Sequence, residues 1–175
     1  MIKKPLFPFL ISLVLILFSA VSCNFTFPNF SPNSTVTTSD AVTIGEATVV
    51  KVVDGDTIDV NISGQVYRVR YIGIDTPETV DPNQTVEPFG PEASSKNKEL
   101  VAGKVVRLEK DVSETDKYDR LLRYVYVGDL FVNAELVRLG YARATAYPPD
   151  TKYQSLFVSL EQQAKAARRG MWGNN

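Results

Sequence analysis

The fold is decided by residues 42–72, which read VTIGEATVVKVVDGDTIDVNISGQVYRVRYI. Apolar and β-branched residues form three runs in this stretch, separated by Asp54-Gly55 and by Ser63-Gly64. Such dipeptides between strand-like runs are strong signals for tight two-residue turns. The pattern predicts a meander of three strands. These strands are expected at residues 42–53, 57–62 and 66–72.

The rest of the chain alternates further strands with helices. A polar loop with three prolines spans residues 77–88, and glycines or prolines then mark the ends of the later elements. The predicted helices are 90–102, 131–139 and 151–169, and the predicted strands are 105–108 and 121–127. In the last helix we expect Leu156, Leu160 and Ala164 (or Ala167) to share the buried face.

Five short strands with helices inserted between and after them predict an α+β chain that is mainly β. The architecture that fits this order best is a five-stranded Greek-key barrel of the OB-fold type with about three helices. A split α+β sheet would give a similar order of elements, so the pattern alone leaves both open.

The N-terminus has the features of an export segment. Lys3 and Lys4 precede an apolar run at residues 6–21, which is shorter than the roughly 20 residues that cross a bilayer as a helix. The only cysteine, Cys23, follows small residues in a pattern that resembles a bacterial lipobox, and a stretch rich in Ser, Thr, Asn and Pro comes next. The expected division is a signal peptide at 1–22, a tether at 23–40 with a lipidated Cys23, and a domain at 41–175. An ordinary cleavable signal or an uncleaved anchor is the alternative.

The composition excludes several kinds of site. The 175 residues include no histidine and one cysteine, which rules out a Ser-His-Asp triad, a histidine-ligated zinc site and an internal disulfide. Removal of residues 1–22 would take away two lysines and no acid, leaving 17 of the 19 basic residues against 20 acidic ones. Nucleic-acid-binding proteins are usually basic, so such a role depends on local charge. Positive charge gathers at residues 138–169, where six bases accompany two acids.

Two segments near the first strands can bind a metal ion and a phosphate. Asp54 and Asp56 flank a turn glycine and offer the hard oxygen ligands that Ca2+ prefers, although an ordinary turn would have the same sequence. In a straight strand, Arg70 and Asp75 would lie about 16 Å apart on opposite faces. They can serve one site only if the chain bends between them, and Gly73 is the natural place for the bend.

Four segments together resemble the staphylococcal nuclease family, and with a closing Trp172 they follow the family's order over residues 42–172. The segments are Val53-Asp54-Gly55-Asp56-Thr57, Arg70 through Asp75-Thr76-Pro77-Glu78, Asp116-Lys117-Tyr118-Asp119-Arg120, and Val132-Asn133 leading to Val137-Arg138-Leu139-Gly140. Each segment alone reads as a turn, a strand or a solvated run of charges. Together they imply an OB-fold nuclease that depends on calcium.

The resemblance implies a metal site and a set of catalytic groups. The calcium ligands would be the carboxylates of Asp56 and Asp75 and the backbone carbonyl of Thr76, with Asp54 as a further acid close to the metal. The proposed general base, or water-orienting group, corresponds to Glu78. The two arginines that bind the scissile phosphate correspond to Arg70 and Arg120. Paired guanidiniums and a divalent cation suit a phosphodiester, because attack by water adds negative charge to the phosphate oxygens.

The resemblance also implies substrate contacts. Lys117 and Tyr118 match positions that contact a terminal phosphate of a bound nucleotide. The family usually has two tyrosines near residue 147, whereas this chain has only Tyr147. Asp119 stands where glycine is frequent, next to Arg120. That acid could weaken the field of the arginine or point away from it.

These expectations describe an exported monomer, lipid-anchored at the cell envelope or secreted. It would hydrolyse DNA and RNA, single-stranded or unpaired, and leave 3′-phosphate ends. One alternative is a non-catalytic module that binds single-stranded nucleic acid, as other OB-type barrels do. Another is a surface lipoprotein that uses the barrel only as a scaffold.

Overall fold

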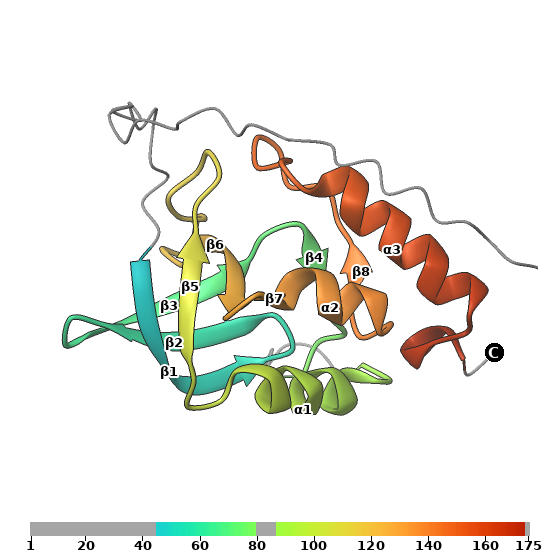
Figure 1. Ribbon diagram of the computed structural model, residues 1–175, viewed down its shortest axis with the longest axis horizontal. Coiled ribbons are helices and arrows are strands. Elements are labelled where there is room, and N and C mark those ends of the chain that lie inside the picture. Colours follow the sequence, from blue (N-terminus) through green and yellow to red (C-terminus); the bar gives the residue numbers. More distant parts are fainter. Residues whose placement is uncertain (1–44, 80–86, 174–175) are drawn as a thin grey trace, which may run out of the picture. The chain divides into compact units, whose positions relative to one another are not determined.

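Three consecutive antiparallel strands open the domain, as the sequence predicts (Figure 1). They are β1 (Gly45–Asp54), β2 (Thr57–Ile62) and β3 (Gln65–Tyr71). The computed structural model describes residues 45–79 and 87–173. The predicted signal peptide (1–22), tether (23–40) and lipidated Cys23 lie outside the described residues. Within 45–79 and 87–173, no helix has the length and apolar character needed to span a membrane.

A parallel pairing closes the sheet into a five-stranded barrel. From β1 the sheet continues through β5 (Val105–Glu109) to β6 (Leu121–Val127). Strand β6 then pairs in parallel with β3, with Tyr71 opposite Arg123, so that the two ends of the sheet meet. The predicted five-stranded barrel is confirmed, and the split sheet is wrong.

Strand β1 serves both halves of the barrel because it is bent. Its first half pairs with β5, with Thr48 opposite Val105, and its second half pairs with β2. The register against β2 shifts twice, and such bulges increase the local twist of a strand. The second shift ends at Asp54, where the chain enters the turn that carries the predicted metal ligand Asp56.

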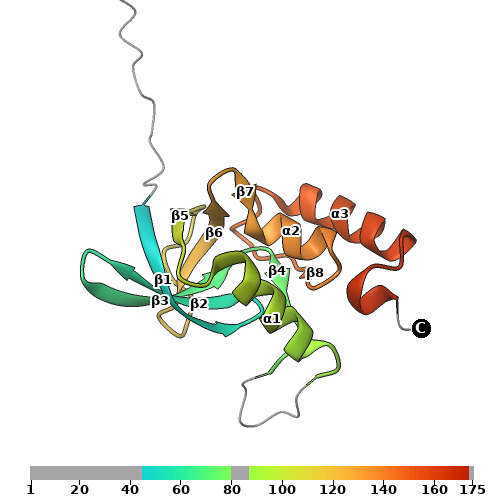
Figure 2. The same ribbon diagram turned by 60° about the horizontal axis from the view of Figure 1, so that its bottom comes forward.

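Three helices cover the side of the barrel away from the β2–β3 hairpin, as two views show (Figures 1 and 2). They are α1 (Gly90–Val101), α2 (Val132–Arg138) and α3 (Gln154–Ala166). Helix α1 packs against β1, while α2 packs against β6 and α3. The barrel core consists largely of fully buried β-branched side chains, among them Ile58, Val60, Val69, Val106 and Val125.

The buried face of α3 differs from the prediction. Leu156 is 41% exposed and Ala167 is exposed, whereas Phe157 is fully buried. Phe157, Leu160 and Ala164 form the face that packs on the core, so the predicted stripe was displaced by one residue at its start. The aromatic ring prevails because it buries more apolar area than the neighbouring leucine.

Four short elements were not predicted. They are β4 (Ile74–Asp75), β7 (Leu130–Phe131), β8 (Arg143–Ala144) and a 3-10 turn at Gly170–Trp172. Strands β4 and β8 pair in antiparallel fashion and place Asp75 opposite Arg143. A two-residue strand is too short to show a periodic pattern of apolar residues, so the sequence pattern cannot predict it. Such strands form where tertiary contacts bring their partners together.

Candidate active site

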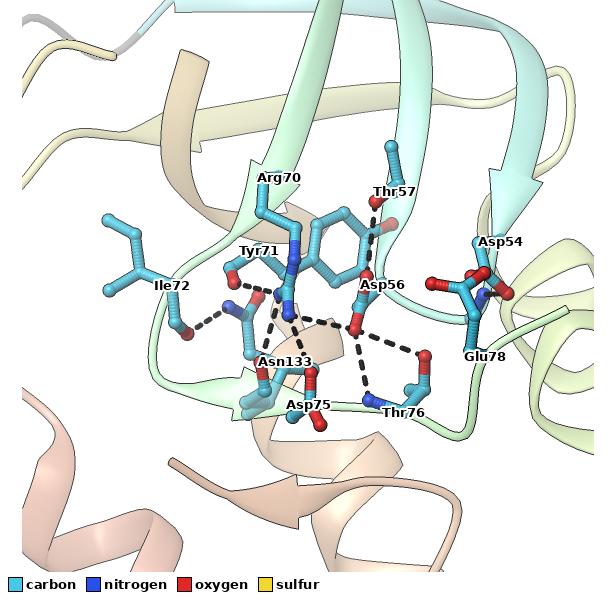
Figure 3. Close-up of polar contacts among 12 residues, drawn as sticks. Asp54, Asp56, Thr57, Arg70, Tyr71, Ile72, Asp75, Thr76, Glu78 and Asn133 are labelled. Atoms are coloured by element: carbon cyan, nitrogen blue, oxygen red, sulfur yellow. Dashed lines mark hydrogen bonds and ion pairs between the residues drawn. The ribbon is translucent and has the colours of Figure 1, made fainter. Parts of the chain in front are cut away.

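The chain bends sharply at Gly73, between β3 and β4, as the sequence predicts. Gly73 has a φ of +77°, a left-handed conformation that glycine adopts without strain. The Arg70 side chain holds the bend, because its Nη1 donates to the carbonyls of Tyr71 (2.7 Å) and Ile74 (2.9 Å). Its Nη2 donates to Asp75 Oδ1 at 3.0 Å (Figure 3). Two residues that a straight strand would separate therefore share one site.

Asp56 brings a second carboxylate to the same guanidinium. Its Oδ2 lies 3.1 Å from Arg70 Nη2 and accepts hydrogen bonds from Thr76 N (2.9 Å) and Thr76 Oγ1 (3.1 Å). Its Oδ1 accepts a hydrogen bond from Thr57 Oγ1 at 3.1 Å. Asp56 is 5% exposed, and these partners offset the cost of burying its charge. Gly55 is needed beside it, because a Cβ there would lie 2.6 Å from Thr76 Oγ1.

A second pair of carboxyl groups joins Asp54, the last residue of β1, with Glu78 from the loop after β4. Asp54 Oδ1 accepts hydrogen bonds from Gly55 N and Thr79 Oγ1, each at 2.7 Å. Glu78 Oε1 accepts a hydrogen bond from Thr79 N at 2.8 Å, and its carboxyl group lies beside Asp54 in Figure 3. Burial raises the pKa of Asp54 above its usual 3.8, and the nearby Asp56 and Glu78 add to the rise against the hydrogen bonds from Thr79 and Gly55.

Arg120, the second predicted phosphate-binding arginine, comes from the loop before β6. Asp116 Oδ2 lies 2.7 Å from both its Nε and its Nη2. Asp116 Oδ1 accepts backbone hydrogen bonds from Tyr118 N (2.9 Å) and Arg120 N (3.1 Å), which fix the loop. Asp119 has a φ of +59° and is exposed, and in the described part of the chain it forms no ion pair with Arg120. That backbone conformation explains why glycine suits this position.

A cavity of about 310 Å³ brings together the residues predicted for the metal and for catalysis. Its lining includes Asp54, Asp56, Arg70, Asp75, Thr76, Glu78 and Arg120. These residues come from the end of β1 and the turn after it, from β3, from β4 and the loop after it, and from the loop before β6. Closure of the barrel by the β3–β6 pairing is what places the two arginines at one cavity.

The predicted substrate contacts lie outside this cavity. Tyr118 is 67% exposed and lines an adjoining pocket of about 400 Å³, which we call the outer pocket; its lining residues are Asp59, Val66, Arg68, Tyr118 and Arg120. Lys117 is exposed, and its Nζ lies 4.9 Å from the centre of the Tyr118 ring. Tyr147 is partly buried against the hydrophobic core and lines neither pocket.

Two residues of the site were missed: Arg68, for which the sequence held a signal, and Thr79, for which it held none. Arg68 lines both the cavity and the outer pocket. It stands two residues before Arg70, and side chains at that spacing share one face of a strand. Thr79 follows Glu78 directly and donates hydrogen bonds to both carboxyl groups of the second pair.

The buried side-chain amides of Asn97 and Asn133 hold the backbone of the site in position. The pattern of apolar residues in the sequence did not predict either role. Asn97 in α1 is fully buried; its Nδ2 donates to the Asp54 carbonyl (2.8 Å) and its Oδ1 accepts from Tyr71 Oη (3.0 Å). Asn133 in α2 is fully buried as well, and its Nδ2 donates to the Ile72 carbonyl at 3.0 Å. The two helices thus hold the β1–β2 turn and the end of β3 in place.

The oxygen groups around Arg70 suit a hard divalent cation. Asp56 Oδ2 and Asp75 Oδ1 both contact Arg70 Nη2, so the pair already converges on one positive charge. The Asp75 side chain is half exposed, which leaves the pair accessible from solvent. Burial and the charge of Asp56 raise the pKa of Asp75, against the charges of Arg70 and Arg143. No cluster of three or more His, Cys, Asp or Glu side chains suited to a metal occurs in 45–79 or 87–173.

Comparison with known proteins identifies the family. Residues 68–174 match the family described as staphylococcal nuclease homologue. The chain is 46% identical over 129 residues to a thermonuclease of Staphylococcus intermedius, covering 73% of this chain and 77% of that protein. It is 47% identical over 132 residues to the SPbeta prophage-derived endonuclease YokF of Bacillus subtilis, covering 74% of this chain and 45% of that protein. Similarity of this extent shows that the chain is a nuclease and belongs to the staphylococcal nuclease family.

Proposed function

We propose that the chain is a calcium-dependent nuclease that hydrolyses phosphodiester bonds of DNA and RNA and leaves 3′-phosphate ends. The observation that carries the proposal is the convergence of Arg70, Arg120 and Glu78 with the acidic pair Asp56 and Asp75 at one cavity. The nuclease relatives and the presence of all five groups favour hydrolysis over a module that only binds nucleic acid.

The two arginines are held so that they can receive a phosphate. The Arg70 guanidinium is fixed by two backbone carbonyls, and that of Arg120 by the Asp116 carboxylate. Both side chains are ordered before substrate binds, which reduces the entropy lost at that step, although Arg70 would exchange its contacts with Asp56 and Asp75 for the phosphate. Arg120 uses Nε and Nη2 for Asp116, which leaves its Nη1 for a phosphate oxygen, whereas Nη1 and Nη2 of Arg70 contact Tyr71, Ile74, Asp75 and Asp56. Preorganised donors act most strongly where charge develops in the transition state.

The acidic pair would hold the cation. Asp56 and Asp75 would supply carboxylate oxygens and Thr76 its backbone carbonyl, a donor set that suits calcium. A bound calcium ion supplies Lewis-acid stabilisation of charge on the phosphate. On the protein side, Thr76 N and Oγ1 hold Asp56 Oδ2 in position through the hydrogen bonds described above.

Glu78 is the group suited to accept a proton from the attacking water. The chain has no histidine, so the base has to be a carboxylate or another side chain. Glu78 lines the cavity, and its Oε1 is anchored by Thr79 N. One carboxylate oxygen is therefore fixed by the protein, and the group is oriented toward the same cavity as the arginines.

The proposal is tested by incubating the full chain with single-stranded DNA, with calcium or with a chelator, and measuring cleavage on a gel. We expect degradation that requires calcium and falls by about 100-fold or more in Arg70→Ala and Arg120→Ala, the scale of one lost transition-state donor. A fall of about 100-fold or more is expected in Glu78→Ser as well, the scale of one lost general base. Arg138→Ala is the control, because this exposed arginine lies on α2, away from the cavity. DNA that is retarded but intact would refute the enzyme, and a near-normal rate in Arg120→Ala would refute its role.

A further inference from the structure

A third arginine stands at the boundary of the cavity and the outer pocket. Arg68 lies two residues before Arg70 on β3, so their Cα atoms are about 7 Å apart and their side chains share one face of the strand. Arg68 and Arg120 line both the cavity and the outer pocket. The two pockets therefore form one continuous surface, with two guanidiniums along the boundary.

Arg68 is oriented by an acid in the same way as Arg120. Its Nε and Nη2 lie 2.8 and 3.2 Å from the two carboxylate oxygens of Asp59, which pairs with it across the β2–β3 ladder. Within the described residues, Nη1 of Arg68 has no acceptor at hydrogen-bond distance. The side chain is 49% exposed, while that of Asp59 is 15% exposed. The acid thus holds one edge of the guanidinium and leaves the other edge toward solvent.

The walls of the outer pocket suit one nucleotide. Tyr118 is 67% exposed, and its ring lies close to two cations, with Lys117 Nζ at 4.9 Å and Arg120 Cζ at 5.4 Å from the ring centre. Val66, on the same face of β3 as Arg68, is 57% exposed. Proteins that bind single strands combine cationic groups along the phosphate backbone with exposed rings on which bases stack. The pocket has both parts, and it opens directly beside the arginines of the cavity.

We propose that Arg68 binds the phosphate next to the scissile phosphate, and that the outer pocket holds the adjoining nucleotide of a single strand. This inference rests on the proposed function, and it makes the preferred substrate a strand with at least one phosphate beyond the scissile one. The competing explanation is that the Arg68–Asp59 pair only stabilises the β2–β3 hairpin.

The first experiment compares the full chain with Arg68→Ala on a thymidine hexanucleotide and on a dinucleotide that has only the scissile phosphate. We expect Arg68→Ala to raise KM for the hexanucleotide about ten-fold, the low end for a hydrogen bond to a charged group, with a smaller effect on kcat. The loss on the dinucleotide should be several-fold smaller. Arg138→Ala is a matched control, because its Nε and Nη2 also contact one carboxylate and its side chain is 45% exposed.

The dependence of KM on salt separates a phosphate contact from a structural role. For a single strand, loss of one phosphate contact should reduce the slope of log KM against log salt concentration by about 0.7. Arg68→Lys should restore the slope, because it keeps the charge. Equal losses on both substrates, or an unchanged slope in Arg68→Ala, would overturn the inference in favour of the hairpin explanation.

A neutral methylphosphonate at each phosphate in turn locates the contact. At the phosphate that Arg68 binds, the methylphosphonate should raise the KM of the wild type about as much as Arg68→Ala does. In the Arg68→Ala variant the same methylphosphonate should raise KM little further, as expected for partners in one interaction. Additive losses at every position would refute the contact. A wild type that cleaves no strand would refute the proposed function instead, so the two failures are distinguishable.

Discussion

Substitution of Gly73 by alanine should strongly destabilise the protein, because two separate costs meet at this residue. Its φ of +77° is disfavoured for a residue with a Cβ, which costs about 1–2 kcal/mol. A Cβ would also lie 2.6 Å from Cε2 and 2.8 Å from Cδ2 of Phe157, which is fully buried. Overpacking of this kind costs about 1–3 kcal/mol. We expect Gly73→Ala to lower the free energy of unfolding by about 2–5 kcal/mol.

Urea unfolding of the wild type and of two glycine variants separates these costs. Gly103 has a similar φ of +68°, but nothing lies within 4 Å of its Cβ position, so Gly103→Ala should lose only the backbone contribution. The difference between the variants then measures the clash with Phe157. In a Phe157→Leu background the clash is smaller, so Gly73→Ala should cost less there than in the wild type. Equal losses in Gly73→Ala and Gly103→Ala would refute the reasoning.

Three further predictions concern charge, buried polar groups and the cation. Burial raises the pKa of Glu109, but hydrogen bonds from Lys152 and Tyr153 lower it to a value below the usual 4.5, so the carboxylate stabilises the folded state above that pH. The stability advantage of the wild type over Glu109→Gln should therefore shrink as pH falls below about 4.5 in urea titrations. Asn97→Ala should lower the free energy of unfolding by about 2–4 kcal/mol, because it leaves two buried groups without partners; a loss under about 1 kcal/mol would contradict this. Calcium at about 100 times its Kd should stabilise the protein by about 2.7 kcal/mol, and the absence of a shift in the wild type, or an equal shift in Asp75→Asn, would contradict the assigned ligands.

The first half of the fold could be predicted because its signals are local. Asp54-Gly55 and Ser63-Gly64 each set a turn from adjacent residues, and the observed β2 has the predicted bounds, residues 57–62. The bend at Gly73 could also be predicted, since only a bend brings Arg70 to Asp75. Local chemistry was sufficient wherever a turn residue determined the path of the chain.

The remaining features depend on contacts between distant segments. No pattern within α3 showed that Phe157 rather than Leu156 would face the core, because that choice depends on the rings it meets, among them Tyr124 and Phe131. The hydrogen bonds of Asn97 likewise join α1 to the β1–β2 turn, far away in the sequence. A polar residue in a predicted helix is ordinarily assigned to the solvent-exposed face, so only the structure could show that Asn97 is buried.

At the cavity, residue identities came from the sequence and their partners from the structure. The resemblance placed Arg120 beside the scissile phosphate, but it did not show that Asp116 would hold its guanidinium. The resemblance implies no role for Arg68, because it implies roles only at positions that match the family. Side chains alternate between the two faces of a strand, and this rule alone predicts that Arg68, two residues before Arg70, lies on the same face.

The parallel pairing of β3 with β6 has a consequence for how the protein acquires activity. Arg70 lies in that ladder opposite Leu122, and Arg120 immediately precedes it, so both guanidiniums reach their places only when the barrel closes. The paired segments are roughly 50 residues apart, and contacts of such long range form slowly because their loop entropy must be overcome first. During refolding, hairpin and helix signals in far-ultraviolet circular dichroism should therefore recover before cleavage does. An intermediate in which the turns have formed but β3 and β6 have not yet paired would be structured and inactive.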